Sequence, residues 1–212
     1  GVLTSQVISS GNSISIDGKE IPVFSQSDPA KLPWQDLGVD AVLESTGVFT
    51  RKEGAYRHIS SGAHKVVISE PGHDPDVTII PGLNDFEYKR DIHQVVSMGS
   101  CTANCLAPIA RILHDNFGIL YGQMTTVHSY TSNQVLLDNF HKNLRRARSF
   151  DQSIIPTTTT AIEAIGRVIP ELVGRLHGIS VRVPTPKVAL VDCVMAFSKK
   201  TTVEEINHKL VT

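Results

Sequence analysis

Short apolar runs that alternate with helix-like segments constrain the fold of the first hundred residues more than any other feature. Four runs, each long enough for one buried strand, cover residues 39–47, 64–69, 77–82 and 93–100. Between the first and second runs, residues 51–63 carry alanine, tyrosine and isoleucine side chains on one helical face. Strands that alternate with helices are typical of a mostly parallel sheet with both faces covered. This half is therefore predicted to be α/β.

Two other local patterns predict structure in the same half. Residues 12–24 alternate apolar and polar side chains around Asp17-Gly18, which indicates a β-hairpin. Residues 84–92, between the third and fourth apolar runs, have the pattern of a short helix. We therefore expect a hairpin near the start of the chain and a helix before the fourth run.

A strong helix pattern opens the second half of the chain. Residues 101–117 carry four apolar side chains, from Leu106 to Phe117, at helical spacing, and Gly118 follows as a stop signal. The later strand patterns are longer and do not alternate with helices, so we expect a domain boundary near residue 100. The polar segment 133–152 has no clear period. The remaining predicted elements are strands at 123–131, 178–184 and 188–197 and helices that begin at the capping-box pairs Thr160–Glu163 and Thr202–Glu205.

Composition excludes several classes of protein. The chain has 212 residues and a formal net charge of −1, so no overall charge attracts it to nucleic acid or to an anionic membrane. No apolar run approaches the roughly 20 residues of a membrane-spanning helix. Three cysteines, an odd number, argue against a disulfide framework and for a reducing compartment. We expect a cytoplasmic protein without nucleic-acid or membrane partners.

Two of the cysteines, Cys101 and Cys105, lie four residues apart where the fourth apolar run meets the long helix. One such pair is a weak zinc signal, and a disulfide within one helix is geometrically awkward, so no metal site is expected. Cys105 and Cys193 are interpreted as small buried hydrophobic residues. Cys101 differs because free N–H groups at a helix start favour a thiolate. His128 ends an apolar strand and is a candidate base by position, although spacing does not pair it with Cys101.

Several motifs carry a resemblance to a known family. The segments "SCTANCLAP" (100–108), "VHSYTSNQ", "HKNLRRAR", "IIPTTTTA" and "VRVPTPKV" resemble, in this order, segments of phosphorylating glyceraldehyde-3-phosphate dehydrogenases. The resemblance implies an α/β fold, in which residues 1–100 would form the C-terminal part of a Rossmann-type NAD(P)-binding domain. Residues 101–212 would form an α+β catalytic domain with a mainly antiparallel sheet, incomplete at its C-terminal end.

The resemblance also implies a role for each matching position. Cys101 would attack the aldehyde, and His128 would take the hydroxyl proton while hydride leaves for NAD or NADP. Inorganic phosphate would then release the acyl group from sulfur, giving 1,3-bisphosphoglycerate from glyceraldehyde 3-phosphate. The implied binding residues are Ser100, Thr102, Thr131, Arg146, Thr159, Thr160 and Arg182 for substrate and phosphate, and Thr46, Gly47 and Ser69 for the dinucleotide.

The chain departs from the family pattern at several points. Asn133 stands where an aspartate is usual, and Thr160 and Glu163 replace a glycine and a lysine near the anion site. The Gly-rich phosphate turn and the acidic residue that distinguishes NAD from NADP are not found. We therefore expect the chain to correspond to an internal part of a longer enzyme, lacking both ends, which need not hold cofactor alone.

Two alternative functions remain open on the sequence. Erythrose-4-phosphate dehydrogenase uses the same thiol chemistry, and "QSIIP" (152–156) resembles that enzyme. The other alternative is a catalytically incomplete fragment or interaction module, in which Cys101 would be unreactive. The segment 133–152 resembles a family loop that packs between subunits, so the resemblance implies a homotetramer.

Overall fold

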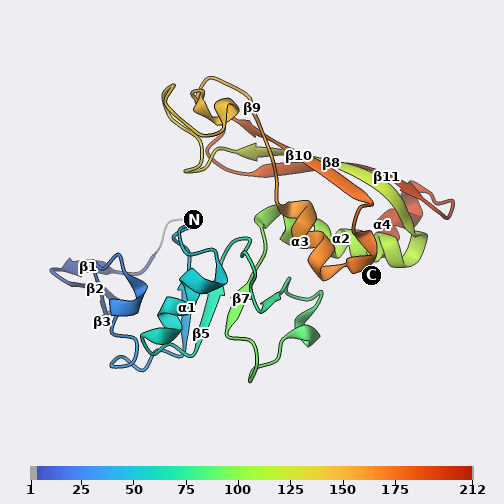
Figure 1. Cartoon of the computed structure of the whole chain (residues 1–212). Helices are drawn as coiled ribbons and strands as arrows, with labels where there is room; N and C mark the ends of the chain where they lie inside the picture. The colour runs from blue at the N-terminus through green and yellow to red at the C-terminus, as the bar shows by residue number, and fades with distance from the viewer. Residues whose placement is uncertain (1–3, 212) are drawn as a thin grey trace.

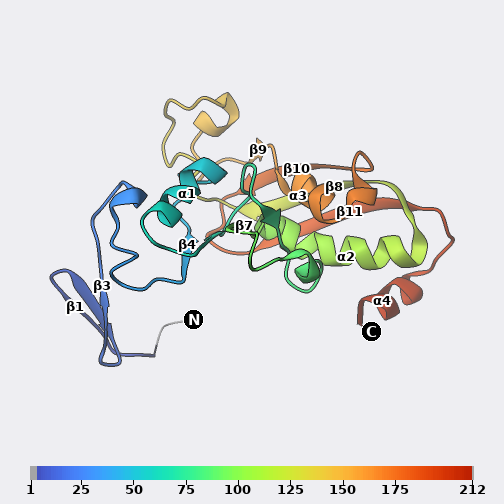
Figure 2. The same cartoon turned by 60° about the horizontal axis from the view of Figure 1, so that its bottom comes forward.

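The computed structural model describes residues 4–211, which form two halves (Figure 1). The first half holds a three-stranded sheet and a four-stranded parallel sheet, and the second holds a long four-stranded mixed sheet. Helices α2 and α3 pack against the mixed sheet, and Figure 2 shows α2 lying along its length. The predicted α/β class is confirmed. In the described part of the chain, no helix is both long and apolar enough to cross a membrane.

The N-terminal sheet is an antiparallel meander. It consists of β1 (Val7–Ser10), β2 (Ser13–Ile16) and β3 (Lys19–Pro22). Asp17 and Gly18 join β2 to β3 with φ angles of 51° and 83°. Two consecutive positive φ angles are what a two-residue hairpin turn requires, and Asp-Gly adopts them at low cost. The predicted hairpin is confirmed.

The first half also contains a four-stranded parallel sheet. Its strand order is β4-β5-β7-β6, and every pairing is parallel. Helix α1 packs against β5, where Ala55 and Val66 are fully buried. The predicted parallel sheet is therefore confirmed, although the third apolar run forms a strand of only two residues. The bounds are β4 (Ala41–Glu44), α1 (Lys52–Ser60), β5 (Lys65–Ile68), β6 (Val77–Thr78) and β7 (Val95–Ser97).

The helix predicted for residues 84–92 is wrong, because only a 3₁₀ turn forms there, at Asp85–Glu87. The buried Asn84 side chain accepts a hydrogen bond from the Ile80 N–H at 2.8 Å and donates one to the Thr78 carbonyl at 2.9 Å. These bonds hold the backbone in a compact loop instead of a helix.

Helix α2 (Cys101–Phe117) has the predicted bounds. The Ser100 hydroxyl caps its start by accepting a hydrogen bond from the Ala103 N–H at 3.0 Å. Gly118 ends the helix with a φ of 70°, a conformation that glycine adopts most readily. The apolar face of α2 joins the main hydrophobic core, which lies between α2, α3 and the mixed sheet.

The mixed sheet has the order β11-β8-β10-β9. Strand β8 pairs in parallel with β10, whereas β11 and β9 pair antiparallel with their neighbours. The expected antiparallel character thus holds for two of three pairings, and the central pairing is parallel. The bounds are β8 (Ile119–Ser129), β9 (Ile155–Thr157), β10 (Leu176–Val183) and β11 (Ala189–Phe197), with 3₁₀ turns at Pro29–Lys31, Leu144–Ala147 and Pro170–Leu172.

The two predicted capping boxes have different outcomes. At α4 (Val203–Val211) the box is confirmed, because Thr202 and Glu205 bond each other's backbone N–H groups at 3.2 and 2.9 Å. At α3 (Ala161–Val168) the Thr160 side chain makes no cap bond. The hydroxyl of the preceding residue, Thr159, accepts from the Ala161 N–H at 3.1 Å and takes that role.

The prediction that Cys105 is buried is wrong, because its side chain is exposed. The buried face of α2 centres on Leu106, Ala107 and Ala110, and Cys105 lies beside that face. Its neighbours form an apolar groove between α2, β11 and α4. Cys193 is half-buried in the same groove, and burial raises the pKa of its thiol, with Asp192 adding to the shift.

Candidate active site

Cys101 is the first residue of α2, directly after the turn that leaves β7. Gly99 in that turn has a φ of 67°, which lets the chain reverse sharply between strand and helix. The Cys101 side chain is exposed. A thiol at this point faces the free N–H groups of the first helical turn, whose partial positive charge favours a thiolate.

His128 approaches this thiol from the mixed sheet. It is the penultimate residue of β8, and its Nε2 atom lies 3.4 Å from Cys101 Sγ. This is hydrogen-bond distance for sulfur. The sequence could not pair these residues by spacing, whereas the fold brings them together at the junction of the two halves.

Arg182 lies beside His128 on β10, directly opposite it in the parallel register. Its Nη1 atom donates to His128 Nδ1 at 2.7 Å and to the Ser129 carbonyl at 2.8 Å. Because a guanidinium only donates, Nδ1 accepts in this arrangement and the ring proton is on Nε2, facing Cys101. Nδ1 also lies 2.8 Å from the Ser129 carbonyl, which would accept its proton in the other tautomer.

An open cleft, whose empty space measures about 1430 Å³ including its mouth, lies around Cys101. Of the twelve residues predicted for the site, ten line this cleft. The other two are His128, which contacts the thiol, and Thr46, which adjoins a lining residue. The ten are Gly47, Ser69, Ser100, Cys101, Thr102, Thr131, Arg146, Thr159, Thr160 and Arg182.

One side of the cleft carries uncompensated positive charge. Neither Arg146 nor Arg182 forms a salt bridge with any residue from 4 to 211. Burial lowers the pKa of the Arg182 guanidinium and Arg146 lowers it further, against an opposing effect of Cys101. Two guanidinium groups close enough to perturb each other favour an anion between or beside them. Thr131 and Asn133 line the same side.

The opposite side of the cleft is formed by the carboxyl ends of β4 and β5. Gly47 and Ser69 line it, and a Cβ atom on Gly47 would lie 3.2 Å from Glu70 Oε1. Open α/β sheets bind ligands at this edge of their strands. The small side chains leave room for a flat ring within the cleft that holds Cys101, so these residues fit the nicotinamide end of a dinucleotide.

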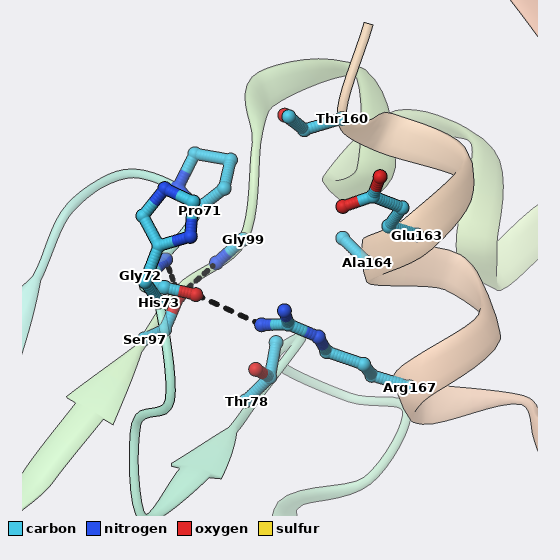
Figure 3. Close-up of a pocket in the computed structure, with 10 residues that line it drawn as sticks. All are labelled: Pro71, Gly72, His73, Thr78, Ser97, Gly99, Thr160, Glu163, Ala164 and Arg167. Carbon is cyan, nitrogen blue, oxygen red and sulfur yellow. Dashed lines mark hydrogen bonds between the residues drawn. The ribbon is translucent and has the colours of Figure 1, made fainter. Parts of the chain in front are cut away.

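A smaller pocket adjoins the cleft and shares Pro71, His73 and Thr160 with it (Figure 3). At its base the buried Ser97 hydroxyl accepts hydrogen bonds from the N–H groups of Gly72 and Gly99 and donates one to the Glu70 carbonyl.

Arg167 forms the other wall of this smaller pocket. It reaches from α3 and donates to the Gly72 carbonyl at 2.8 Å, which links the second half of the chain to the loop after β5 (Figure 3). Glu163, the residue that replaces the family's lysine, points toward this pocket (Figure 3).

Sequence reasoning missed Glu70 and His73, which also line the cleft. Both follow Ser69 in the loop after β5. The general rule that ligand-binding residues follow the strands of a parallel sheet could have found them. Thr158 and Ser180 are further lining residues from the second half.

Fold and site together define a class of protein: two-part α/β proteins with a thiol–imidazole pair between a parallel sheet and a mixed sheet. The family model described as glyceraldehyde 3-phosphate dehydrogenase, C-terminal domain, matches residues 100–212. The model described as the NAD binding domain of the same family matches residues 1–52. The chain belongs to the glyceraldehyde-3-phosphate dehydrogenase family.

Curated relatives match nearly the whole chain. A glyceraldehyde-3-phosphate dehydrogenase of Geobacillus stearothermophilus is 51% identical over 210 residues, which is 99% of this chain and 63% of the relative. Glyceraldehyde-3-phosphate dehydrogenase 2 of Trichormus variabilis is 50% identical over 199 residues, covering 94% of this chain and 59% of the relative. Glyceraldehyde-3-phosphate dehydrogenase 1 of Bacillus cereus is 50% identical over 207 residues, 98% of this chain and 62% of the relative. The chain thus spans about three-fifths of the length of these relatives.

Proposed function

We propose that the protein is a phosphorylating aldehyde dehydrogenase that oxidises glyceraldehyde 3-phosphate with NAD(P)⁺ and inorganic phosphate to 1,3-bisphosphoglycerate. The observation that carries the proposal is the 3.4 Å approach of His128 Nε2 to Cys101 Sγ at a cleft lined by two guanidinium groups, Arg146 and Arg182, that form no salt bridge within residues 4–211. A thiolate is both a good nucleophile and a good leaving group, so one residue can form and release an acyl group.

The first steps follow from the geometry. Cys101 Sγ attacks the aldehyde carbon, a C–S bond forms as the C=O π bond breaks, and the oxygen takes up the proton that the thiol has released and becomes a hydroxyl. Thr46, Gly47 and Ser69 would hold a nicotinamide dinucleotide, which would accept the hydride from the former aldehyde carbon. His128 takes the hydroxyl proton at Nε2 as the thioester forms.

The base step requires a change of tautomer at His128. In the present arrangement Nε2 carries the proton and faces Cys101 Sγ. The base form has its proton on Nδ1, where the Ser129 carbonyl lies 2.8 Å away and can accept it. An anionic substrate that draws Arg182 away from Nδ1 favours this form.

Release of the product needs a second anion beside the thioester. Phosphate oxygen attacks the acyl carbon, the C–S bond breaks, and the electron pair returns to Cys101 as a thiolate. We assign Arg146, Arg182 and Thr131 to the anion-binding side, with the hydroxyl groups of Ser100, Thr102, Thr159 and Thr160 nearby.

Peptide-resolved alkylation tests the thiol without any cofactor. We expect iodoacetamide to modify Cys101 faster than Cys105, which is exposed but has no hydrogen bond with an imidazole in the part of the chain that the structure describes, and far faster than Cys193, whose thiol pKa is raised. Equal rates at Cys101 and Cys105 would contradict the proposal and favour a catalytically incomplete fragment or interaction module.

Aldehyde oxidation tests the reaction itself. Reduction of NAD⁺ and of NADP⁺ by glyceraldehyde 3-phosphate should require phosphate and should disappear in Cys101→Ser but persist in Cys105→Ser. Retained activity in Cys101→Ser would show that Cys101 is not the nucleophile.

Erythrose-4-phosphate dehydrogenase is the second candidate, because Asn133 and Thr160, two departures from the family pattern, both line the cleft. A side chain in place of glycine at position 160 narrows the phosphate side, which would favour hydrolysis of the thioester over its phosphorolysis. A higher kcat/KM for erythrose 4-phosphate, without dependence on phosphate, would decide for this enzyme.

We also propose the division into two domains near residue 100 and a homotetrameric, cytoplasmic enzyme. The assembly proposal is supported by exposed apolar side chains in the segment 133–152, where Leu137, Phe140 and Leu144 are 73%, 101% and 83% exposed. Sedimentation equilibrium tests it: a monomer at micromolar concentration would contradict it. The location rests on the three free cysteines.

A further inference from the structure

Glu44 and His58 form a buried polar pair that the proposed reaction does not use. Glu44 is the last residue of β4, His58 lies in α1, and their side chains are 3% and 5% exposed. Glu44 Oε2 and His58 Nε2 are 3.0 Å apart. On its far side the ring meets the half-buried Trp34, whose indole Nε1–H donates to His58 Nδ1 at 2.9 Å. Buried polar groups of this kind are costly unless every partner is satisfied.

The three side chains fix one another's proton positions. An indole nitrogen only donates, so His58 Nδ1 must accept and the ring proton is on Nε2. Nε2–H therefore donates to Glu44 Oε2. Burial alone raises the pKa of Glu44, but hydrogen bonds from Thr46 and His58 outweigh it and the pKa is lowered. The chain of bonds has a single direction, from Trp34 to Glu44.

The second carboxylate oxygen holds the turn after β4. Glu44 Oε1 accepts from the Thr46 backbone N–H at 2.7 Å and from the Thr46 hydroxyl at 2.5 Å. The same hydroxyl accepts from the Val48 N–H at 3.1 Å. Gly47, between them, has a φ of 73°. The conformation of the whole turn thus depends on one buried carboxylate.

The end of the turn is anchored to the same ring. The Phe49 ring lies edge-on to His58, with 6.3 Å between centroids. His58 therefore supports the turn twice, through Glu44 and through Phe49. The turn in between carries Gly47 into the wall of the Cys101 cleft, where it faces Glu70.

We propose that Trp34, His58 and Glu44 form a positioning network that sets the Thr46–Gly47 turn and, through it, the wall of the cleft that receives the nicotinamide dinucleotide. The identity of that ligand rests on the proposed function, whereas the control of the turn does not. Glu44 and His58 are positioning residues, because they act through Thr46 and Gly47 and do not line the cleft.

The decisive variant is Glu44→Gln. The amide oxygen of Gln can still accept from Thr46, but its NH₂ group would face the Nε2–H of His58, which is also a donor. The ring must then move its proton to Nδ1, and the hydrogen bond from Trp34 to Nδ1 is lost. The matched control is Glu53→Gln, which removes the same charge from the exposed face of α1. Amide hydrogen exchange of residues 46–48 reads the turn directly. Calorimetry measures the affinity of the cleft for NAD⁺. The fluorescence emission of Trp34, the single tryptophan of the chain, reports the environment at the other end of the network.

We expect Glu44→Gln to speed exchange at residues 46–48 by about ten-fold or more and to weaken NAD⁺ binding by about ten-fold. The emission maximum of Trp34 should move, while the alkylation rate of Cys101 should stay within about two-fold of the unmodified protein. Glu53→Gln should match the unmodified protein in every readout.

A pair of variants at His58 separates positioning from general destabilisation. His58→Gln can accept from Trp34 with its amide oxygen and donate to Glu44 with its NH₂ group, so it should retain slow exchange at residues 46–48. His58→Leu removes both bonds and should behave like Glu44→Gln. If His58→Gln and His58→Leu were equally impaired, the hydrogen-bond network would not be the cause and the proposal would fail.

Unchanged exchange at residues 46–48 in Glu44→Gln would overturn the network outright. Faster exchange with unchanged NAD⁺ affinity would overturn its role in cofactor positioning. Failure of the unmodified protein to bind NAD⁺ would count against the proposed function instead, and the exchange data would still decide whether the network controls the turn.

Discussion

Replacing the buried Ser97 by alanine should weaken the fold and the active site together. The Ser97 hydroxyl uses its whole bonding capacity within the protein. It accepts from the N–H groups of Gly72 and Gly99 at 2.9 and 3.2 Å and donates to the Glu70 carbonyl at 3.0 Å. The side chain is completely buried, so no bulk water replaces these partners in Ser97→Ala.

The magnitude follows from these three bonds. A buried intramolecular hydrogen bond contributes about 1 kcal/mol net, and a buried group left unpaired costs about 1–3 kcal/mol. Losing three bonds at once should therefore lower the free energy of unfolding by about 3 kcal/mol. The Gly99 bond also fixes the turn before Cys101, so the alkylation rate of Cys101 should fall even in conditions where the variant is fully folded.

Urea unfolding followed by circular dichroism measures the first effect, and peptide-resolved alkylation measures the second. Ser60→Ala is the control, because the Ser60 hydroxyl makes one exposed bond, at 3.3 Å, to the Tyr56 carbonyl. That variant should stay within about 0.5 kcal/mol of the unmodified protein. A loss in Ser97→Ala no larger than that of the control would mean that the three hydrogen bonds of Ser97 do not stabilise the fold.

Three further substitutions test other features of the structure. His128→Ala should slow alkylation of Cys101 by about ten-fold or more while leaving the other two cysteines unchanged, because the thiolate loses its partner at Nε2; an unchanged rate would mean that the 3.4 Å contact has no chemical effect. Burial raises the pKa of Asp76, but bonds from a lysine and from two backbone N–H groups prevail and lower it, so its stabilisation is present above the unfolded value and is lost as the pH falls below about 4. Urea unfolding across that range should show a weaker pH dependence in Asp76→Asn, and an identical slope would contradict this account. Gly62→Ala should cost about 2 kcal/mol or more, because Gly62 has a φ of 111° and a Cβ atom there would lie 2.4–2.6 Å from facing atoms; Gly11→Ala, with open space around it, should cost clearly less in the same thermal unfolding assay.

The elements that the sequence predicted best are those with local causes. Helix α2 has the expected bounds because a capping serine, an apolar stripe and Gly118 act within the segment itself. The hairpin at Asp17-Gly18 is equally local, since two residues decide the turn. The family resemblance rested on several motifs in order, and the match over residues 100–212 confirms it.

The elements that were wrong depend on distant or competing contacts. The helix expected at residues 84–92 is replaced by a loop because the Asn84 side chain forms hydrogen bonds with the backbone of Thr78 and Ile80, which precede it in the chain. The exposure of Cys105 could not be predicted, because it depends on which neighbours cover the edge of α2. The approach of Cys101 to His128 likewise depends on the assembled sheet. The residue types suggested both residues as candidates, but their separation in the sequence could not predict the contact.

The parallel pairing of β8 with β10 has a consequence for the order of events during folding. Arg182 and His128 are 54 residues apart, and His128 and Cys101 are 27 apart, so the three side chains meet only after two large loops have closed. Loop closure of this kind is slow compared with helix formation. We expect α2 to form early and to present an unpartnered thiol until β8 packs beside it and brings His128 to Cys101. Arg182 joins the pair when β10 docks beside β8. Selective alkylation of Cys101 would then report the assembly of the thiol–imidazole pair, which helix content does not, and Cys101 of a refolding chain would react slowly until His128 reaches it.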